Sequence, residues 1–407
     1  MSLLTKASLV MTPNAIKSNK VYSIIPSNGN GDLTFTRDTS ATQINSLGNV
    51  ENVLTTIPRL NYDTVGGCPS LLLEPQRTNL VLRSEEFSNV NWEKGTPITL
   101  VSNTTETTSP QGINNATKAT ANGTGLIHIR QSVFGATTSP TTNSIFVKKA
   151  NNRYVGFRNG GSGTLHDVFD FNTETWTNNS GSTLSFDKLT NGWYRLKSSR
   201  TNTLPNTYIS VTIPDNTSGN ETATVSNLTL YLWGGQSELN VLYPTSYIPT
   251  TTTALTRNAD VITRNNIYTN GLITSAGGTW FLEVINNLVY IRDSPSSGIY
   301  LDTNNASFTS GFNIRTEPTN RRLSISKWSP GSVLYTTLAD IVKIAIKWNG
   351  VTADVFVNGT KEVSATAFTT TAMQFLGGRA EDCPKNIKQI ALWATPLTDA
   401  ECIALTQ

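Results

Sequence analysis

Residues 340–363 read DIVKIAIKWNGVTADVFVNGTKEV and hold two Asn-Gly pairs between runs of apolar and β-branched residues. The runs at 340–348 and 354–357 have the composition and alternation of half-buried strands. Asn-Gly at 349–350 and at 358–359 supplies residues that accept positive φ, which tight hairpin turns require. The stretch therefore predicts a three-stranded antiparallel meander on one face of a β-sandwich.

Short strand signals recur along most of the chain, with turn residues between them. Clear examples, each bounded by Asn, Gly or Ser, are 144–148, 153–157 and 193–197. Sustained helical periodicity is nearly absent. The exception is 398–405, where Thr398 can cap the first turn and Glu401 follows three positions later, as in a capping box. These patterns predict an all-β fold of two jelly-roll β-sandwiches in tandem.

The composition argues against several classes of partner. Charged residues make up 14% of the 407 residues, and 31 Lys and Arg against 28 Asp and Glu leave a net charge of +3. Nucleic-acid binders concentrate basic residues in a patch or stripe, which this sequence lacks, so we expect no nucleic-acid partner. No apolar run approaches the roughly 18 residues that span a bilayer, so we expect no membrane partner.

A Pro- and Thr-rich stretch at 244–253 has few large apolar residues and is typical of a segment that joins two folded units. A second change of character occurs near position 77, where an irregular, turn-rich segment ends. We therefore divide the chain into an N-terminal docking segment at 1–76, a β-sandwich at 77–248, a linker at 249–257 and a second β-sandwich at 258–407. Two structural ion pairs are expected at the boundaries: Glu74 with Arg77, and Arg257 with Asp260.

Four features of the C-terminal part occur together: Val-Asn-Gly at 357–359, Leu-Gly-Gly at 376–378, an apolar closing strand at 387–393 and a short helix from 396. In this order they resemble the concanavalin A-like, laminin-G-like jelly roll. The resemblance implies that the second β-sandwich has this fold.

A series of motifs in the first 260 residues keeps a specific order and spacing: 33–42, 57–63, 68–80, 84–87 with Trp92, 191–195, 233–238, 245–250 and 255–260. They resemble a group of bacteriophage virion proteins, the tail or head appendage proteins. Asp38 departs from that group, in which a small residue is commoner at this position. The stretch from 78 to 233 resembles a carbohydrate-binding-module jelly roll more loosely.

Catalytic motifs are scarce. Only two histidines are present, and no G-x-S-x-G, H-E-x-x-H or P-loop motif occurs. The carboxylates at 167, 170 and 174 fit a solvated strand and turn. We therefore expect no enzyme activity. The cysteines at 68, 383 and 402 form no Cys-x-x-Cys pair, and no Asp-rich calcium loop occurs. We expect no cofactor, and calcium has no support in the sequence.

Glycan binding requires aromatic faces for sugar C–H groups, together with amides or carboxylates for hydroxyls. Tyr154, His166 and Trp176 lie in the first sandwich and are the candidate residues for a glycan or a partner protein. Trp176 is flanked by Thr and Asn, so we expect it at a loop tip. Trp193 and Trp348 lie within apolar alternation and are expected in the core.

The resemblance implies a phage virion structural protein, a head or tail appendage component that acts in assembly and surface presentation. It would be made in the bacterial cytoplasm and carried on the virion, because its first 11 residues make at most a weak export signal. Its partners would be other virion proteins and copies of itself, with a trimer expected by analogy with fibre-like parts. The alternatives are an adhesin that binds a host glycan and, third, a glycan depolymerase.

Overall fold

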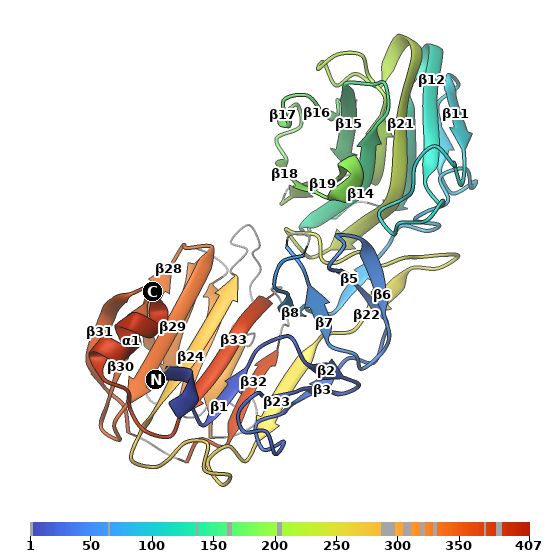
Figure 1. Ribbon diagram of the computed structural model, residues 1–407. Coiled ribbons are helices and arrows are strands. Elements are labelled where there is room, and N and C mark those ends of the chain that lie inside the picture. Colours follow the sequence, from blue (N-terminus) through green and yellow to red (C-terminus); the bar gives the residue numbers. More distant parts are fainter. Residues whose placement is uncertain are drawn as a thin grey trace. The chain divides into compact units, whose positions relative to one another are not determined.

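A computed structural model describes residues 3–63, 66–135, 137–160, 165–201, 206–285, 298–303, 311–317, 322–328, 332–369, 372–379 and 385–407. The chain is nearly all β, which confirms the predicted fold class. It divides into two compact units (Figure 1): unit 1 consists of 1–43, 52–76 and 258–407, and unit 2 consists of 44–51 and 77–257. In sequence, most of unit 2 is therefore inserted between the second and third segments of unit 1.

The described residues of unit 1 form two large antiparallel sheets. The first contains, in order, β31 (Thr360–Ala367), β30 (Thr352–Val357), β29 (Ile341–Trp348), β24 (Gly278–Ile285), β33 (Lys385–Trp393), β8 (Ser70–Leu73) and β7 (Arg59–Asn61), with β1 (Leu9–Met11) also paired to β33. The second contains β2 (Ile16–Lys17), β3 (Lys20–Val21), β4 (Leu33–Thr36), β23 (Val261–Asn265), β32 (Phe375–Arg379), β25 (Gly298–Asp302), β26 (Gly311–Glu317), β27 (Arg322–Trp328) and β28 (Ser332–Thr337).

The predicted meander is confirmed as the antiparallel strands β29, β30 and β31. At the second turn, Asn358 has a φ of 46° and Gly359 a φ of 84°, as a hairpin of this kind demands. At the first turn, the side chain of Asn349 accepts from the backbone N–H groups of Val351 and Thr352. The Asn residues therefore fix both ends of β30.

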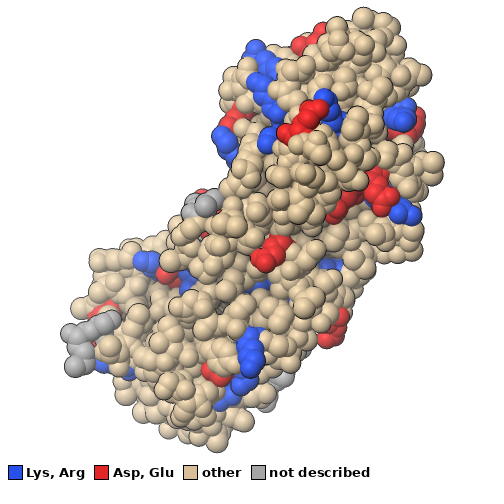
Figure 2. All heavy atoms as spheres, turned by 45° about the vertical axis from the view of Figure 1, so that its right-hand side comes forward, with Lys and Arg blue, Asp and Glu red and all other residues tan. Residues whose placement is uncertain are grey.

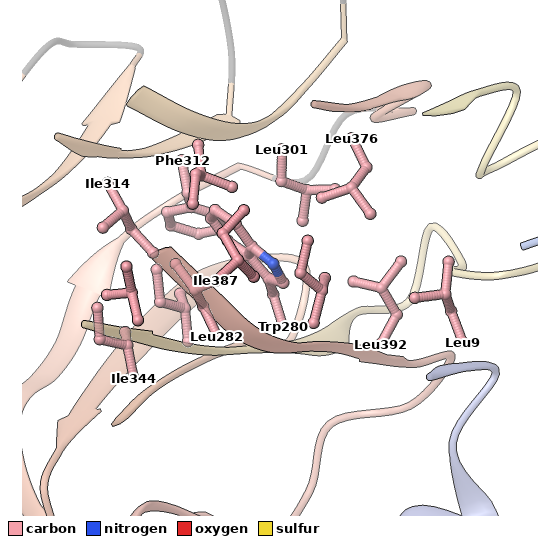
Figure 3. Close-up of a cluster of buried hydrophobic side chains, with 14 of the residues drawn as sticks. Leu9, Trp280, Leu282, Leu301, Phe312, Ile314, Ile344, Leu376, Ile387 and Leu392 are labelled. Atoms are coloured by element: carbon pink, nitrogen blue, oxygen red, sulfur yellow. The ribbon is translucent and has the colours of Figure 1, made fainter. Parts of the chain in front are cut away.

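The core of unit 1 is formed by side chains from both sheets (Figure 3). Residues from the first sheet include Trp280, Leu282, Ile344, Ile387 and Leu392, and residues from the second include Leu301, Phe312, Ile314 and Leu376. Each of these is almost fully buried. Burial of one such side chain contributes about 1.5–3 kcal/mol, so this cluster is the main source of stability in unit 1.

The N-terminal segment supplies strands to both of these sheets. Strands β1, β7 and β8 belong to the first sheet, and β2, β3 and β4 belong to the second. Leu9, Phe35 and Leu71 are fully buried in the same core. The segment at 1–76, which we set apart as a docking segment, thus supplies strands and core residues to the C-terminal sandwich.

The other face of the first sheet is covered by the helix α1 (Asp399–Thr406), which buries Cys402 in a small cluster with Phe281, Phe356 and Trp393. The 3₁₀ turn η1 (Leu3–Lys6) lies at the same place, because the Leu3 carbonyl accepts from Trp393 Nε1 at 3.1 Å. The predicted capping box is present, with Thr398 and Glu401 bonded reciprocally. Neither α1 nor any other helix among the described residues is long and apolar enough to cross a membrane.

The described residues of unit 2 form two six-stranded sheets. The first sheet runs β10 (Glu93–Lys94), β13 (His128–Phe134), β20 (Thr207–Thr212), β15 (Tyr154–Asn159), β16 (Asp167–Asp170) and β17 (Thr175–Thr177). The second runs β11 (Ile98–Val101), β12 (Thr117–Leu126), β21 (Thr222–Leu239), β14 (Thr141–Lys149), β19 (Trp193–Arg200) and β18 (Thr183–Lys188). The remaining elements of unit 2 are the pair β9 (Arg77–Asn79) with β22 (Leu255–Arg257) and η2 (Thr190–Gly192). The strands β5 (Ala41–Ile44) and β6 (Val50–Val53) form a hairpin, of which residues 44–51 are assigned to unit 2.

Candidate functional site

Several residues of the virion-like motifs form a buried ionic network in unit 1. Arg37 donates to Asp260 at 3.0 Å, and Arg59 donates to Glu74 at 2.6 Å and also to Asp260. Burial opposes a charged guanidinium, but the carboxylates of Asp260 and Glu74 outweigh it and raise the pKa of Arg59. Asp260 has two arginine partners, Arg37 and Arg59, whereas the sequence suggested Arg257. All four side chains are buried, so the network holds the fold together.

A second buried network joins the motifs at 233–238 and 245–250 in unit 2. Glu238 accepts from Gln236 at 2.9 Å and from the backbone and hydroxyl of Thr245 at 2.9 and 2.6 Å. The side chain of Gln236 accepts from the Ile248 backbone at 2.7 Å. Both motifs therefore serve to fix the chain that follows β21.

The first sheet of unit 2 presents two different faces, and its register places the predicted aromatic residues on opposite ones. Tyr154 pairs with Asp170, whereas Val155 pairs with Phe169 and Phe169 with Trp176. Because cross-strand partners share a face, Trp176 lies on the core side with Phe169, and Tyr154 lies on the outer side. The two rings therefore do not form one platform.

Trp176 is not at a loop tip, and that prediction is wrong. It is the central residue of β17 and is partly buried, with its ring centroid 5.2 Å from that of Phe169. Within the described part of the chain its indole N–H has no hydrogen-bond partner. The ring covers the apolar core at this edge of the sheet.

His166 is completely buried. Its Nε2 lies 2.9 Å from the hydroxyl of Ser210, its backbone N–H donates to the Gly219 carbonyl at 2.7 Å, and its own carbonyl accepts from Asn179 at 2.9 Å. His166 thus joins the middle of the outer sheet face to the loop before β21, in a position that no glycan reaches without rearrangement.

Tyr154 is half-buried on the outer face, beside an ion pair. The guanidinium of Arg153 lies 4.9 Å from the ring centroid and donates to Asp170, from Nε to both carboxylate oxygens at 3.1 and 3.0 Å and from Nη2 at 2.6 Å. The hydrogen bonds from Arg153 lower the pKa of Asp170 to about 2. Of the three predicted residues, His166 is buried, whereas Tyr154 and Trp176 are half-buried, and only Tyr154 of these two faces outward.

The carboxylates at 167, 170 and 174 each have a structural partner. Asp167 accepts from the backbone of Asn179 and Ser180, and Glu174 accepts from Lys188 and Tyr194. Each of these carboxylates stabilises a turn or a strand end, so they do not resemble a catalytic pair.

The same outer face carries a cluster of ionisable residues that the sequence did not predict. It consists of Glu93 on β10, His128 and Arg130 on β13, and Glu221 directly before β21; we call it the Arg130 cluster. Tyr208 on β20 lies beside it, 5.3 Å from the Arg130 guanidinium to the ring centroid. The alternation of polar residues with Ile and Val at 128–130 and 208–212 signals this face, but nothing local links it to Glu93 or Glu221.

The electrostatics of the Arg130 cluster follow from burial and pairing. Burial, reinforced by the charge of Arg130, lowers the pKa of His128 despite its two carboxylate neighbours. The hydrogen bonds from Arg130 lower the pKa of Glu93, and Glu93 in turn raises the pKa of Arg130. Near neutral pH the histidine is therefore uncharged, whereas Glu93 and Arg130 are charged.

A search of the described residues for metal-ligand groups finds no set of three His, Cys, Asp or Glu side chains arranged to hold an ion. Of the cysteines, Cys68 and Cys402 are free thiols, and Cys383 lies outside the described residues. Acidic and basic side chains are mixed over the face seen in Figure 2, without a broad field of one sign.

Comparisons with known proteins give neither a family nor a function. No family model and no curated protein matches the chain. Among solved structures, domain 4 of the arabinanase AbnA from Geobacillus stearothermophilus is 14% identical over 37% of this chain and 73% of that domain, with a TM-score of 0.29. The botulinum neurotoxin serotype D binding domain is 10% identical over 36% of this chain and 40% of that domain, with a TM-score of 0.27. A carbohydrate-binding protein from Bacteroides ovatus, described as putative, is 10% identical over 69% of this chain and 78% of that protein, with a TM-score of 0.25.

Proposed function

We propose that the chain is a structural protein of a bacteriophage virion, a component of a head or tail surface appendage. It acts in assembly and surface presentation, through preformed β-surfaces and without catalysis. Its partners are other virion proteins and copies of itself, with a trimer as the expected assembly. The observation that carries this proposal is the network of Arg37, Arg59, Glu74 and Asp260. The network bonds the motifs that resemble appendage proteins to one another. This is expected if the chain shares the fold of those proteins as well as their motifs.

The proposal is tested on intact particles of the phage that encodes the chain. A gold-labelled antibody against the full chain is expected to mark the head surface or the tail, and the chain is expected among the proteins of purified virions. Particles that carry neither label nor chain would overturn it. Light scattering of the purified protein tests the trimer, because a mass near the 44.2 kDa of one chain would contradict it.

The second candidate is an adhesin that binds a host glycan. The outer face of the first sheet of unit 2 favours it, because two tyrosines there, Tyr154 and Tyr208, each lie beside an arginine and its carboxylate partner. Aromatic rings next to paired donors and acceptors suit sugars. A glycan array probed with the full chain tests this function, and an assay for released reducing ends separates it from the third alternative, a depolymerase.

A further inference from the structure

The Arg130 cluster joins an arginine, a histidine and two carboxylates from three places in the chain. Arg130 donates two hydrogen bonds to Glu93, both at 2.9 Å, and its Nη1 lies 3.9 Å from Glu221 Oε2. His128 lies between the same two carboxylates, with Nε2 3.4 Å from Glu93 and Nδ1 3.6 Å from Glu221. Four side chains thus converge on one spot of the outer sheet face.

Part of the hydrogen-bonding capacity of this cluster is unused. His128 is completely buried, yet neither of its ring nitrogens has a hydrogen-bond partner among the described residues. The same holds, within that part of the chain, for the buried Oε2 of Glu221. His128 Nδ1 and Glu221 Oε2 face each other at 3.6 Å, which is longer than a good hydrogen bond, so both atoms keep the capacity to bond a further polar group.

Tyr208 adds an apolar surface to this polar cluster. Cross-strand pairing places Arg130 opposite Ser210 and Ser132 opposite Tyr208. Tyr208 on β20 therefore lies on the same face of the sheet as Arg130 on the neighbouring strand β13. Its ring is half-buried and lies beside the Arg130 guanidinium. A ligand that contacts Tyr208 therefore also meets Glu93, which is more than half exposed, with 55% of its side-chain surface accessible.

The charge balance of this place selects the ligand. Three arginines, Arg130, Arg158 and Arg200, lie close enough to act on one another here, and the carboxylates of Glu93, Glu221 and Asp167 lie among them. A cationic ligand would be repelled by the arginines and an anionic ligand by the carboxylates. Because charges of both signs are mixed here, no net charge of the site compensates for that repulsion. Hydroxyl groups, which both donate and accept, match adjacent guanidinium and carboxylate groups without any charge of their own.

We propose that the Arg130 cluster and Tyr208 form a binding site for a neutral oligosaccharide. One sugar ring packs its C–H face on Tyr208, and its hydroxyls bond to Glu93, Glu221 and Arg130. This inference rests on the second candidate function, the glycan adhesin, and gives that function a site. The virion role stands independently of it.

The experiment uses the full chain and a printed array of neutral and acidic bacterial oligosaccharides, followed by calorimetric titration of the strongest neutral hit. Tyr208→Ala removes the ring, and Glu93→Gln replaces one acceptor on an exposed side chain. Each is expected to weaken binding about tenfold, with little change in the melting temperature. Tyr208→Phe, which keeps the ring, and Arg83→Ala, which breaks an exposed ion pair of unit 2 outside this face, are the matched controls. Both are expected to bind within about twofold of the parent chain.

The possible outcomes separate the site from the function. If the chain binds a neutral glycan but Tyr208→Ala and Glu93→Gln bind it as tightly as the parent, the site is wrong and the adhesin function stands. If no glycan binds at about 1 mM, both are wrong. Preference for acidic glycans overturns the site. A changed oligomeric mass in Tyr208→Ala, with glycan binding intact, makes the face an interface between copies. If Tyr208→Ala does not fold, Glu93→Gln decides alone.

Discussion

Arg59 and Asp260 form a buried ion pair inside unit 1 although they are 201 positions apart in the sequence. Arg59 lies on β7, in the segment 52–76 of unit 1, and Asp260 lies directly before β23, at the start of the segment 258–407. The pair therefore closes the sandwich across the insertion of unit 2. It ties the N-terminal strands to the C-terminal ones in the folded state.

The first prediction follows from this closure. Residues 258–407 expressed alone are expected not to fold, because they lack β1, β4 and β8 and leave Asp260 without either arginine. The backbone N–H of Asp260 donates to the Glu74 carbonyl at 2.9 Å, so a short Gly-Ser linker can replace 77–257. Joined in this way, 1–76 and 258–407 are expected to show a cooperative thermal transition. A cooperative melt of 258–407 alone would contradict the prediction.

The second prediction concerns the ion pair itself. Arg59→Met leaves the carboxylates of Glu74 and Asp260 buried, with Asp260 keeping Arg37 and the Glu74 backbone N–H as partners, and is expected to cost about 3–5 kcal/mol of unfolding free energy. Arg83→Ala, which breaks a solvent-exposed pair with Glu86, is the control and is expected to cost less than about 1 kcal/mol. Chemical denaturation of the full chain measures both. Equal losses in the two variants would show that the buried network is unimportant for stability.

Local patterns were sufficient to predict part of the fold. The meander at 340–363 and the capping box at Thr398 and Glu401 depend on residues close in sequence, and both are present. The place of β4 and β8 depends on pairing with strands some 200 to 300 positions away, which no local pattern encodes. The N-terminal segment was therefore recognised as distinct in character but not as part of the C-terminal sandwich.

The candidate site was harder to predict for the same reason. Whether Trp176 faces the core or the solvent depends on its register with Phe169, and a shift of one residue would reverse it. The Arg130 cluster requires Glu93 and Glu221 to meet beside β13, which only the folded sheet achieves. Residue type alone selected Tyr154 as a candidate, and only the register of β15 with β16 shows which face of the sheet it occupies.

The third prediction separates two tryptophans by burial. Trp348 is 1% exposed in the core of unit 1, so Trp348→Ala is expected to cost about 3–5 kcal/mol. Trp176 packs on Phe169 but is only partly buried, so Trp176→Ala is expected to cost less, about 1–3 kcal/mol. Trp176→Phe keeps most of the packing and removes an unbonded N–H, and should be nearly neutral. Denaturant titration measures all three variants, and a neutral Trp176→Ala would show that the ring adds nothing to the core.

The fourth prediction concerns the dependence of stability on pH. Because burial and Arg130 lower the pKa of His128 in the folded state, the unfolded chain binds a proton more readily below the ordinary value of 6.5. The stabilising effect of the neutral ring is thus fully present above pH 6.5 and is lost as the pH falls through the folded pKa. Unfolding free energy, measured in urea between about pH 7 and pH 5, is expected to fall by at most about 1.4 kcal/mol per pH unit from this residue. His128→Gln is expected to flatten that slope, whereas Asp170→Asn should leave it unchanged, because Asp170 titrates near pH 2. An unchanged slope in His128→Gln would mean that His128 is not the group that titrates.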